Sequence, residues 1–243
     1  MKLFCFLILC VPYFLYAQEK RPYYITAGAG AGIVNFSIYH PISGKWLAKS
    51  DNPYGAMSII GGIGYEAKSS IWEVKLSYRH WWTTIGYENL NPAEDVPVNG
   101  YPWPLLTSSR NDFRQLTLLP AARVFVSKDI YLLFSPEFSF HFHPYRQINR
   151  WDPQVPSMKV NEIVHLFDKA PSPFLFSISA GAGFKVNRFH VDFRYQQSLN
   201  NLYRNIIYRG ITSEMQIPQS IWSVECTYQI KKAASLKNLF KKI

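Results

Sequence analysis

The feature that most constrains the fold is a two-residue alternation that recurs along the chain. In the segment FSPEFSFHFHPY, at Phe134–Tyr145, phenylalanines occupy one parity, whereas Glu137, His141 and His143 occupy the other. Successive side chains of a strand point to opposite faces, so this segment predicts a strand with one apolar and one polar face. Phe174–Val186 repeats the pattern. We therefore expect an all-β chain, which also suits its aromatic content of 16%.

The alternation predicts eight strands, each long enough for the about 9–11 residues that a tilted membrane-crossing strand needs. They are Tyr23–Tyr39, Tyr54–Ala67, Ile71–Gly86, Asp112–Val126, Ile130–Tyr145, Phe174–Val186, Phe189–Asn200 and Ser220–Ile230. Short connections alternate with long ones, at 40–53, 87–111, 146–173 and 201–219. All short turns then lie at one end. The pattern predicts an eight-stranded antiparallel up-and-down transmembrane β-barrel with short periplasmic turns and long outer loops.

The two ends of the chain differ from this pattern. The opening MKLFCFLILCVPYFLYA predicts a signal peptide over 1–17, which leaves a barrel over 18–230 with both mature termini in the periplasm of a Gram-negative cell. Residues 231–243 form a basic tail whose apolar residues follow helical spacing, which predicts an amphipathic segment on the periplasmic side. Much of the net charge of +10 lies in this tail, so no nucleic-acid partner is expected.

With lipid outside, the polar parity of each strand faces the lumen. Acids and bases should pair there, because an unpaired charge in so narrow an interior would be costly. The expected network comprises Glu73, Lys75, Arg79, Arg123, Glu137, Asp192, Arg194 and Glu225. Eight strands leave room for side chains but little for a channel, so we expect a filled lumen and no diffusion pore. Glycines at GAGAG lack the lysine and helix of a nucleotide-binding loop and should make room for these charges.

Aromatic residues on the apolar parity lie near the strand ends. Two aromatic girdles at the membrane interfaces are therefore expected. The predicted girdle residues are Tyr23, Tyr65, Trp72, Trp82, Phe189, Trp222 and Tyr228.

Three segments carry a resemblance to known barrels: YYITAGAGAGIVNF in the first strand, the hairpin FLFSISAGAGFKVNRFHVDFRY, and SIWSVECTYQI in the last strand. Over 18–230 the chain resembles the small outer-membrane β-barrels of the Bacteroidota, the group that contains PorT-like proteins, and in architecture OmpA/OmpX-type barrels. The resemblance implies an outer-membrane location and roles that range from structure and adhesion to assistance in type IX secretion. The chain departs from such barrels in the thirteen residues that follow Ile230.

One group of residues suggests chemistry. His141 and His143 share a face with Glu137 near the outer rim, and two imidazoles with a carboxylate can bind a metal or act as a base. A lipid A-modifying enzyme, a deacylase or acyltransferase, is therefore one alternative function, although no matching serine accompanies the histidines. Polar lumen lining is favoured, with no cofactor and no metal. A soluble lipocalin-like ligand-binding barrel, with its apolar face inward, is the second alternative.

The expected function is non-enzymatic. A monomeric barrel would act through its outer loops, in surface contact, in a structural role, or as an accessory to a secretion machine such as type IX. Its surroundings would be outer-membrane lipids and lipopolysaccharide, with an envelope or secretion complex as a further partner. Arg146, Arg150 and Trp151 begin the third long loop, where arginine and aromatic side chains suit contact with lipopolysaccharide phosphates.

Overall fold

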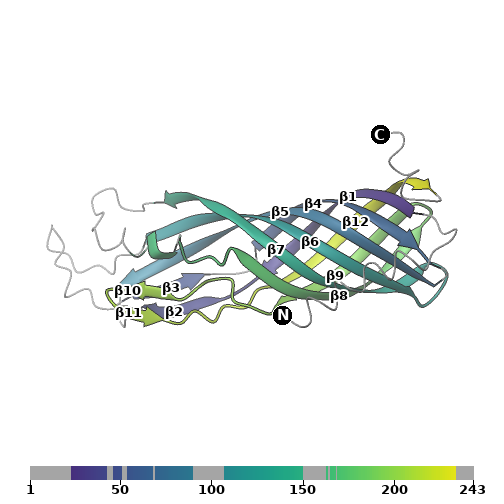
Figure 1. Ribbon diagram of the computed structural model, residues 1–243. Helices are drawn as coiled ribbons and strands as arrows, with labels where there is room; N and C mark the ends of the chain where they lie inside the picture. The colour runs from purple at the N-terminus through teal and green to yellow at the C-terminus, as the bar shows by residue number, and fades with distance from the viewer. Residues whose placement is uncertain are drawn as a thin grey trace.

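The fold is a closed barrel of eight antiparallel strands, which confirms the predicted architecture (Figure 1). The structure is a computed structural model that describes residues 23–42, 46–50, 54–67, 69–89, 107–149, 163, 165–167 and 169–233. The barrel strands are β1 (Tyr23–Asn35), β4 (Tyr54–Glu66), β5 (Ser70–Asn89), β6 (Thr107–Phe125), β7 (Ile130–Asn149), β8 (Phe174–Val186), β9 (Phe189–Ser198) and β12 (Ser220–Ala233). β12 pairs with β1 and closes the ring. Within the described ranges, no helix is long and apolar enough to cross a membrane.

The exterior of the barrel is apolar, whereas its interior carries charges. On β5, Trp72, Val74 and Leu76 are exposed, and the alternate residues Glu73 and Lys75 are buried. A soluble barrel has the opposite arrangement, with its apolar side chains inward. The observed distribution therefore favours a membrane-spanning barrel over the lipocalin-like alternative.

The expected girdle residues stand on the outward parity of their strands. Trp72 and Trp82 lie ten residues apart on β5, which corresponds to about 25 Å of membrane height at a tilt near 40°. That distance matches the apolar band of an outer-membrane barrel. Tyr65 differs from Trp72 and Trp82, because its ring packs at 5.6 Å from the ring of Tyr23 and its exposed fraction is only 9%.

Two of the long connections contain hairpins. β2 (Ile38–Ile42) pairs with β3 (Trp46–Ser50), which pairs in turn with the outer part of β5. β10 (Ile206–Tyr208) pairs with β11 (Ile211–Ser213). Both hairpins lie at the end of the barrel opposite the short turns (Figure 1). β5, β6 and β7 reach further toward this end than expected, with 20, 19 and 20 residues.

The expected continuous strand Tyr23–Tyr39 is wrong, and the long connections expected at 40–53 and 201–219 contain strands that the alternation did not predict. β1 ends at Asn35, because its neighbours end there: β4 begins at Tyr54, opposite Val34, and β12 begins at Ser220, opposite Asn35. Ile38–Ile42 then pairs with β3 instead. The alternation of side chains continues past Asn35, so the sequence does not mark the end of β1. Alternation indicates which face a residue occupies, but it does not indicate which strand that residue pairs with.

The outer part of the interior is apolar, which corrects the expectation of a polar lumen along its whole length. Trp81 of β5 stacks on Phe113 of β6, with ring centroids 4.0 Å apart and planes at 5°. Phe167 and Tyr203, from the connections that follow β7 and β9, pack above them. We call these four side chains and the buried residues around them the apolar roof. The surrounding residues include Val34, Phe36, Ile85, Tyr87, Leu175, Leu202, Ile206, Tyr208, Met215 and Ile217.

Candidate functional site

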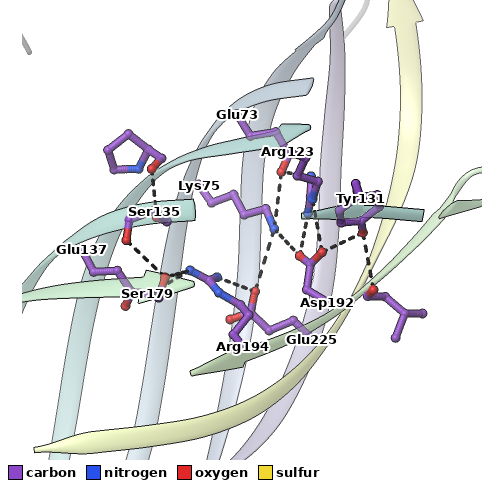
Figure 2. Close-up of polar contacts among 12 residues, drawn as sticks. Glu73, Lys75, Arg123, Tyr131, Ser135, Glu137, Ser179, Asp192, Arg194 and Glu225 are labelled. Carbon is purple, nitrogen blue, oxygen red and sulfur yellow. Dashed lines mark hydrogen bonds and ion pairs between the residues drawn. The ribbon is translucent and has the colours of Figure 1, made fainter. Parts of the chain in front are cut away.

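The barrel interior nearer the short turns is filled by a buried charge network. Arg123 of β6 donates from Nη1 to Glu73 of β5, and from Nη2 to Asp192 Oδ2 of β9 at 2.6 Å. Lys75 Nζ lies 3.2 Å from the same Asp192 oxygen and 3.4 Å from Glu73 Oε2. Two cations and two carboxylates from three strands are thereby joined across the lumen (Figure 2).

A second part of the charge network surrounds Arg194 of β9. Its Nη1 donates to Glu225 Oε2 at 2.8 Å, and its Nη2 donates to Glu137 Oε1 and to Ser179 Oγ, both at 2.7 Å. Lys75 links the two parts, since its Nζ lies 3.9 Å from Glu225 Oε2. Figure 2 shows the two parts side by side. The charge network therefore comprises Glu73, Lys75, Arg123, Glu137, Asp192, Arg194 and Glu225.

Two tyrosines that the sequence interpretation missed complete this network. Tyr24 donates to Glu73 Oε1 at 2.8 Å, and Tyr131 donates to Asp192 Oδ1 at 2.7 Å. Both lie on the inward parity of their strands and are buried. Their inward parity was the sequence signal that could have identified them. Residue type alone was ambiguous, because a tyrosine near a strand end can also belong to a lipid-facing aromatic girdle.

Glycines make space for the long charged side chains. A Cβ on Gly30 would lie 3.0 Å from Cγ of Glu225, and one on Gly62 would lie 3.0 Å from Cγ of Lys75. A Cβ on Gly183 would meet the ring of Tyr131 at 2.6 Å. The volume of the network thus explains part of the small-residue runs, as the sequence predicts, whereas a Cβ on Gly28 or Gly181 would meet backbone oxygens of the neighbouring strand at 2.1 Å and 2.0 Å.

The buried charges balance, with four carboxylates and four cations in the interior that the structure describes. Such groups resist separation, because removing one partner leaves the other charge buried and uncompensated. Arg79, expected in the network, lies apart from it. It donates from Nη1 to Gln196 Oε1 at 2.9 Å, and no described carboxylate lies within ion-pairing distance of its guanidinium.

The weak catalytic candidates do not form a rim site in the described residues. His141 is buried beneath the apolar roof, with its Nδ1 2.8 Å from the carbonyl oxygen of Ser172 and its ring 6.0 Å from that of Phe113. Glu137 is engaged by Arg194 deeper in the barrel. The side chain of His143 lies outside the described part. No group of three or more His, Cys, Asp or Glu side chains within that part is placed to hold a metal ion.

Other expected features fall outside the described residues. The signal peptide at 1–17, Arg150, Trp151 and the tail from residue 234 onward are among them, and only the backbone of Arg146 is described, within β7. The backbone of residues 231–233 does not belong to a separate tail. It continues β12, with Lys231 opposite Ile25 and Ala233 opposite Tyr23.

Comparison with known proteins gives only distant likenesses. No family model and no curated protein matches the chain. Similar solved structures include Neisserial surface protein A, at 10% identity and a TM-score of 0.35, covering 86% of this chain and 97% of that one. Ail, the attachment invasion locus protein of Yersinia pestis, has 12% identity, a TM-score of 0.38 and coverage of 88% and 99%. Outer membrane protease OmpT from Escherichia coli has 9% identity, a TM-score of 0.35 and coverage of 87% and 97%.

TM-scores below 0.5 carry no argument about activity or ligand, and the fold assignment rests on the strand pairing described above. The resemblance to Bacteroidota, PorT-like barrels stays a prediction. What strand pairing and side-chain burial establish is an eight-stranded antiparallel barrel with an apolar exterior and an interior filled by charges and closed by an apolar roof.

Proposed function

We propose that this chain is an integral outer-membrane protein that conducts no solutes and acts, without catalysis, through the elements at its outer end. The observation that carries the proposal is the double closure of its interior. The charge network occupies the lumen nearer the short turns, and the apolar roof occupies it nearer the hairpins. Among the described residues, paired side chains fill the inner half and apolar side chains fill the outer half, so neither offers the open polar path that a water-filled channel requires.

The outer end supports a role in contact. The two hairpins β2–β3 and β10–β11 present exposed apolar side chains, with exposed fractions of 74% for Tyr39 and 60% for Ile207. Lys49 and Glu88 add an exposed ion pair beside Tyr39, at 2.5 Å. The long connections pack one side against the apolar roof, which holds them in place. Their opposite side, which includes the exposed side chains of the two hairpins, is then available for binding. A protein of the envelope or of a secretion machine, or lipopolysaccharide, is the partner class that we propose.

Location and closure are tested together. In cell fractionation the protein should be recovered with the outer membrane. In gel electrophoresis the unheated, folded sample should migrate differently from the boiled sample. In planar bilayers the purified protein should give no steady conductance steps, with a known porin as the positive control. Recovery in the soluble periplasm would contradict the membrane assignment, and regular conductance steps would contradict the closed interior.

Catalysis is tested separately. Lipid A from cells with and without the gene should have the same acyl pattern in mass spectrometry, because His141 and Glu137 are buried beneath the apolar roof or held by Arg194. A changed pattern that is restored by the wild-type gene and not by His141→Ala would identify a lipid A-modifying enzyme and overturn the non-catalytic proposal.

A further inference from the structure

A layer of buried polar residues, most of which have at least one polar atom with no described hydrogen-bond partner, lies between the charge network and the apolar roof. On β5, Lys75 of the charge network is followed by Ser77 and Arg79, and then by Trp81 of the apolar roof. β8 shows the same order. Ser177 lies between Ser179, which contacts Arg194 of the charge network, and Leu175 of the apolar roof. The intermediate residues form a polar belt, which consists of Ser77, Arg79, Gln115, His141 and Ser177.

The members of the polar belt are neighbours across the sheet. Gln115 of β6 stands opposite Arg79 of β5 on one side and opposite His141 of β7 on the other. Ser177 of β8 stands opposite Glu137 of β7. All of these side chains lie on the inward parity and are buried. Arg79, Gln115 and His141 are therefore adjacent across β5, β6 and β7, and Ser177 is adjacent to Glu137 on β7.

Several polar atoms of the polar belt have no hydrogen-bond partner among the described residues. They are Ser77 Oγ, Gln115 Oε1 and Nε2, His141 Nε2 and Ser177 Oγ, and the second carboxylate oxygen of Glu137, which borders the belt, has none either. Arg79 adds a buried positive charge whose one hydrogen bond is to Gln196 Oε1. Unpaired buried polar atoms also occur elsewhere in the described interior, but here they surround a buried guanidinium that has a single hydrogen bond. Buried polar groups in proteins are nearly always satisfied by protein or by ordered water, so this combination indicates a bound species.

The kinds of atom in the belt identify that species. Gln115 Nε2 and the guanidinium of Arg79 donate, whereas Gln115 Oε1 and Glu137 Oε2 accept. A small anion would satisfy only the donors and would lie near the Glu137 carboxylate, and a metal ion would be repelled by Arg79. A water molecule both donates and accepts, and typically makes about three hydrogen bonds in a buried site. We propose that the polar belt binds a cluster of ordered internal waters that connects Arg79 to Glu137.

The enclosure of these waters follows from their neighbours. The stack of Trp81 on Phe113 lies on the outer side of the belt, and the ion pair of Arg194 with Glu137 lies on the other side. The waters would act as part of the fold, solvating Arg79, whose guanidinium has no carboxylate within ion-pairing distance among the described residues. This inference does not depend on the outer end binding a partner, so failure of the proposed function leaves it standing.

A crystal structure of the detergent-solubilised protein, grown in bromide, tests the proposal directly. Ordered waters should lie within hydrogen-bonding distance of Gln115, His141 Nε2 and Ser177, and no anomalous bromide peak should appear near Arg79. A bromide peak there would overturn the proposal in favour of an anion site. Direct hydrogen bonds among the belt side chains, with no water between them, would overturn it in favour of a dry interior.

A matched pair of variants gives an independent test in solution. Ser177→Asn places an amide where water is expected, so the amide takes over the hydrogen bonds of the displaced water, and the urea midpoint should stay unchanged. Ser179→Asn makes the same change two residues along β8, where Ser179 contacts Arg194 at 2.7 Å, and overpacking should lower the midpoint by about 1 M. Equal losses in the two variants would contradict a hydrated belt.

Discussion

Asp192 shows how a single residue determines the charge network. It accepts hydrogen bonds from Arg123, Lys75 and Tyr131, which come from three other strands of the barrel. Its side chain is fully buried, so water offers no substitute for these donors. Arg79 is the contrasting case, because no described carboxylate lies within ion-pairing distance of its buried charge and its hydrogen bond goes to the neutral Gln196.

Asp192→Asn should destabilise the barrel strongly, because it keeps the volume of the side chain but leaves Arg123 and Lys75 with one carboxylate fewer. The expected loss in free energy of unfolding is about 3–5 kcal/mol, measured by urea unfolding in micelles. Glu66→Gln is the control. The ion pair of Glu66 with Lys185 is partly exposed, at 23% and 17%, and its loss should cost at most about 1 kcal/mol. Similar losses in both variants would show that the network contributes no more than a surface pair.

Two adjacent tryptophans on β5 face opposite sides of the barrel wall: Trp81 belongs to the apolar roof, and Trp82 lies on the lipid-facing surface. Trp81→Ala removes a buried ring that stacks on Phe113, and should lower the free energy of unfolding by about 3–5 kcal/mol. Trp82→Ala removes a ring on the outward face and should cost clearly less. Urea unfolding in the same micelles measures both. A larger loss for Trp82→Ala would mean that the alternation is out of register by one residue in this part of β5.

At the scale of elements, the short turns fix which strands are neighbours. β8 and β9 are joined by Asn187 and Arg188 alone, and Val186 pairs with Phe189 across the turn. Asn187 has φ of 55°, in the left-handed region that asparagine and glycine tolerate better than other residues. Two residues suffice because this backbone conformation matches the twist of the flanking strands. The turn therefore sets the register of the whole hairpin.

Asn187→Val should lower the free energy of unfolding by about 1–2 kcal/mol, because a β-branched side chain is strained at this φ. Asn187→Gly should be close to neutral, since glycine adopts the same backbone conformation without strain. The two variants differ in side-chain bulk on the same exposed turn, and heat-dependent gel mobility, followed as a function of temperature, compares them. A Gly variant as unstable as the Val variant would show that the asparagine side chain, and not the backbone conformation, is what matters.

At the scale of the whole molecule, the seam between the first and last strands completes the barrel. β12 pairs with β1 from Ser220, opposite Asn35, to Ala233, opposite Tyr23. Three residues that the sequence interpretation assigned to the tail, 231–233, thus contribute backbone hydrogen bonds to closure. A barrel has no open edge only when this seam is complete, which matters in lipid because an unpaired backbone group there costs several kcal/mol.

Truncation after Ala233 should leave insertion and heat-dependent mobility unchanged, because every described pairing of β12 with β1 is retained. Truncation after Ile230 removes three paired positions at the end of the seam and should lower the yield of folded, membrane-inserted protein. Outer-membrane fractions from cells that express each form at equal levels provide the comparison. Loss of insertion in the longer truncation would show that residues 234–243 are needed for assembly.

The class of fold and the content of the charge network were predictable, because period-two alternation records directly which side of a strand faces lipid. The same alternation predicts that Glu73, Lys75, Arg123 and Asp192 all point inward, although it does not say which charge meets which. Arg79 was assigned to the network on parity alone. Its height along the barrel, set by strand register, places it among neutral groups instead.

The sequence by itself determined the eight barrel strands, their two faces and their order along the chain, since these follow from local periodicity and from connection length. Tertiary structure decided what fills the outer half of the interior. In the run HWWTTIGY the inward parity carries Trp81, Ile85 and Tyr87, but the partners of Trp81 and Tyr87 are Phe113 and Phe167 from other segments. Closure of the outer end depends on long-range contacts between connections, and no local pattern encodes which connections meet.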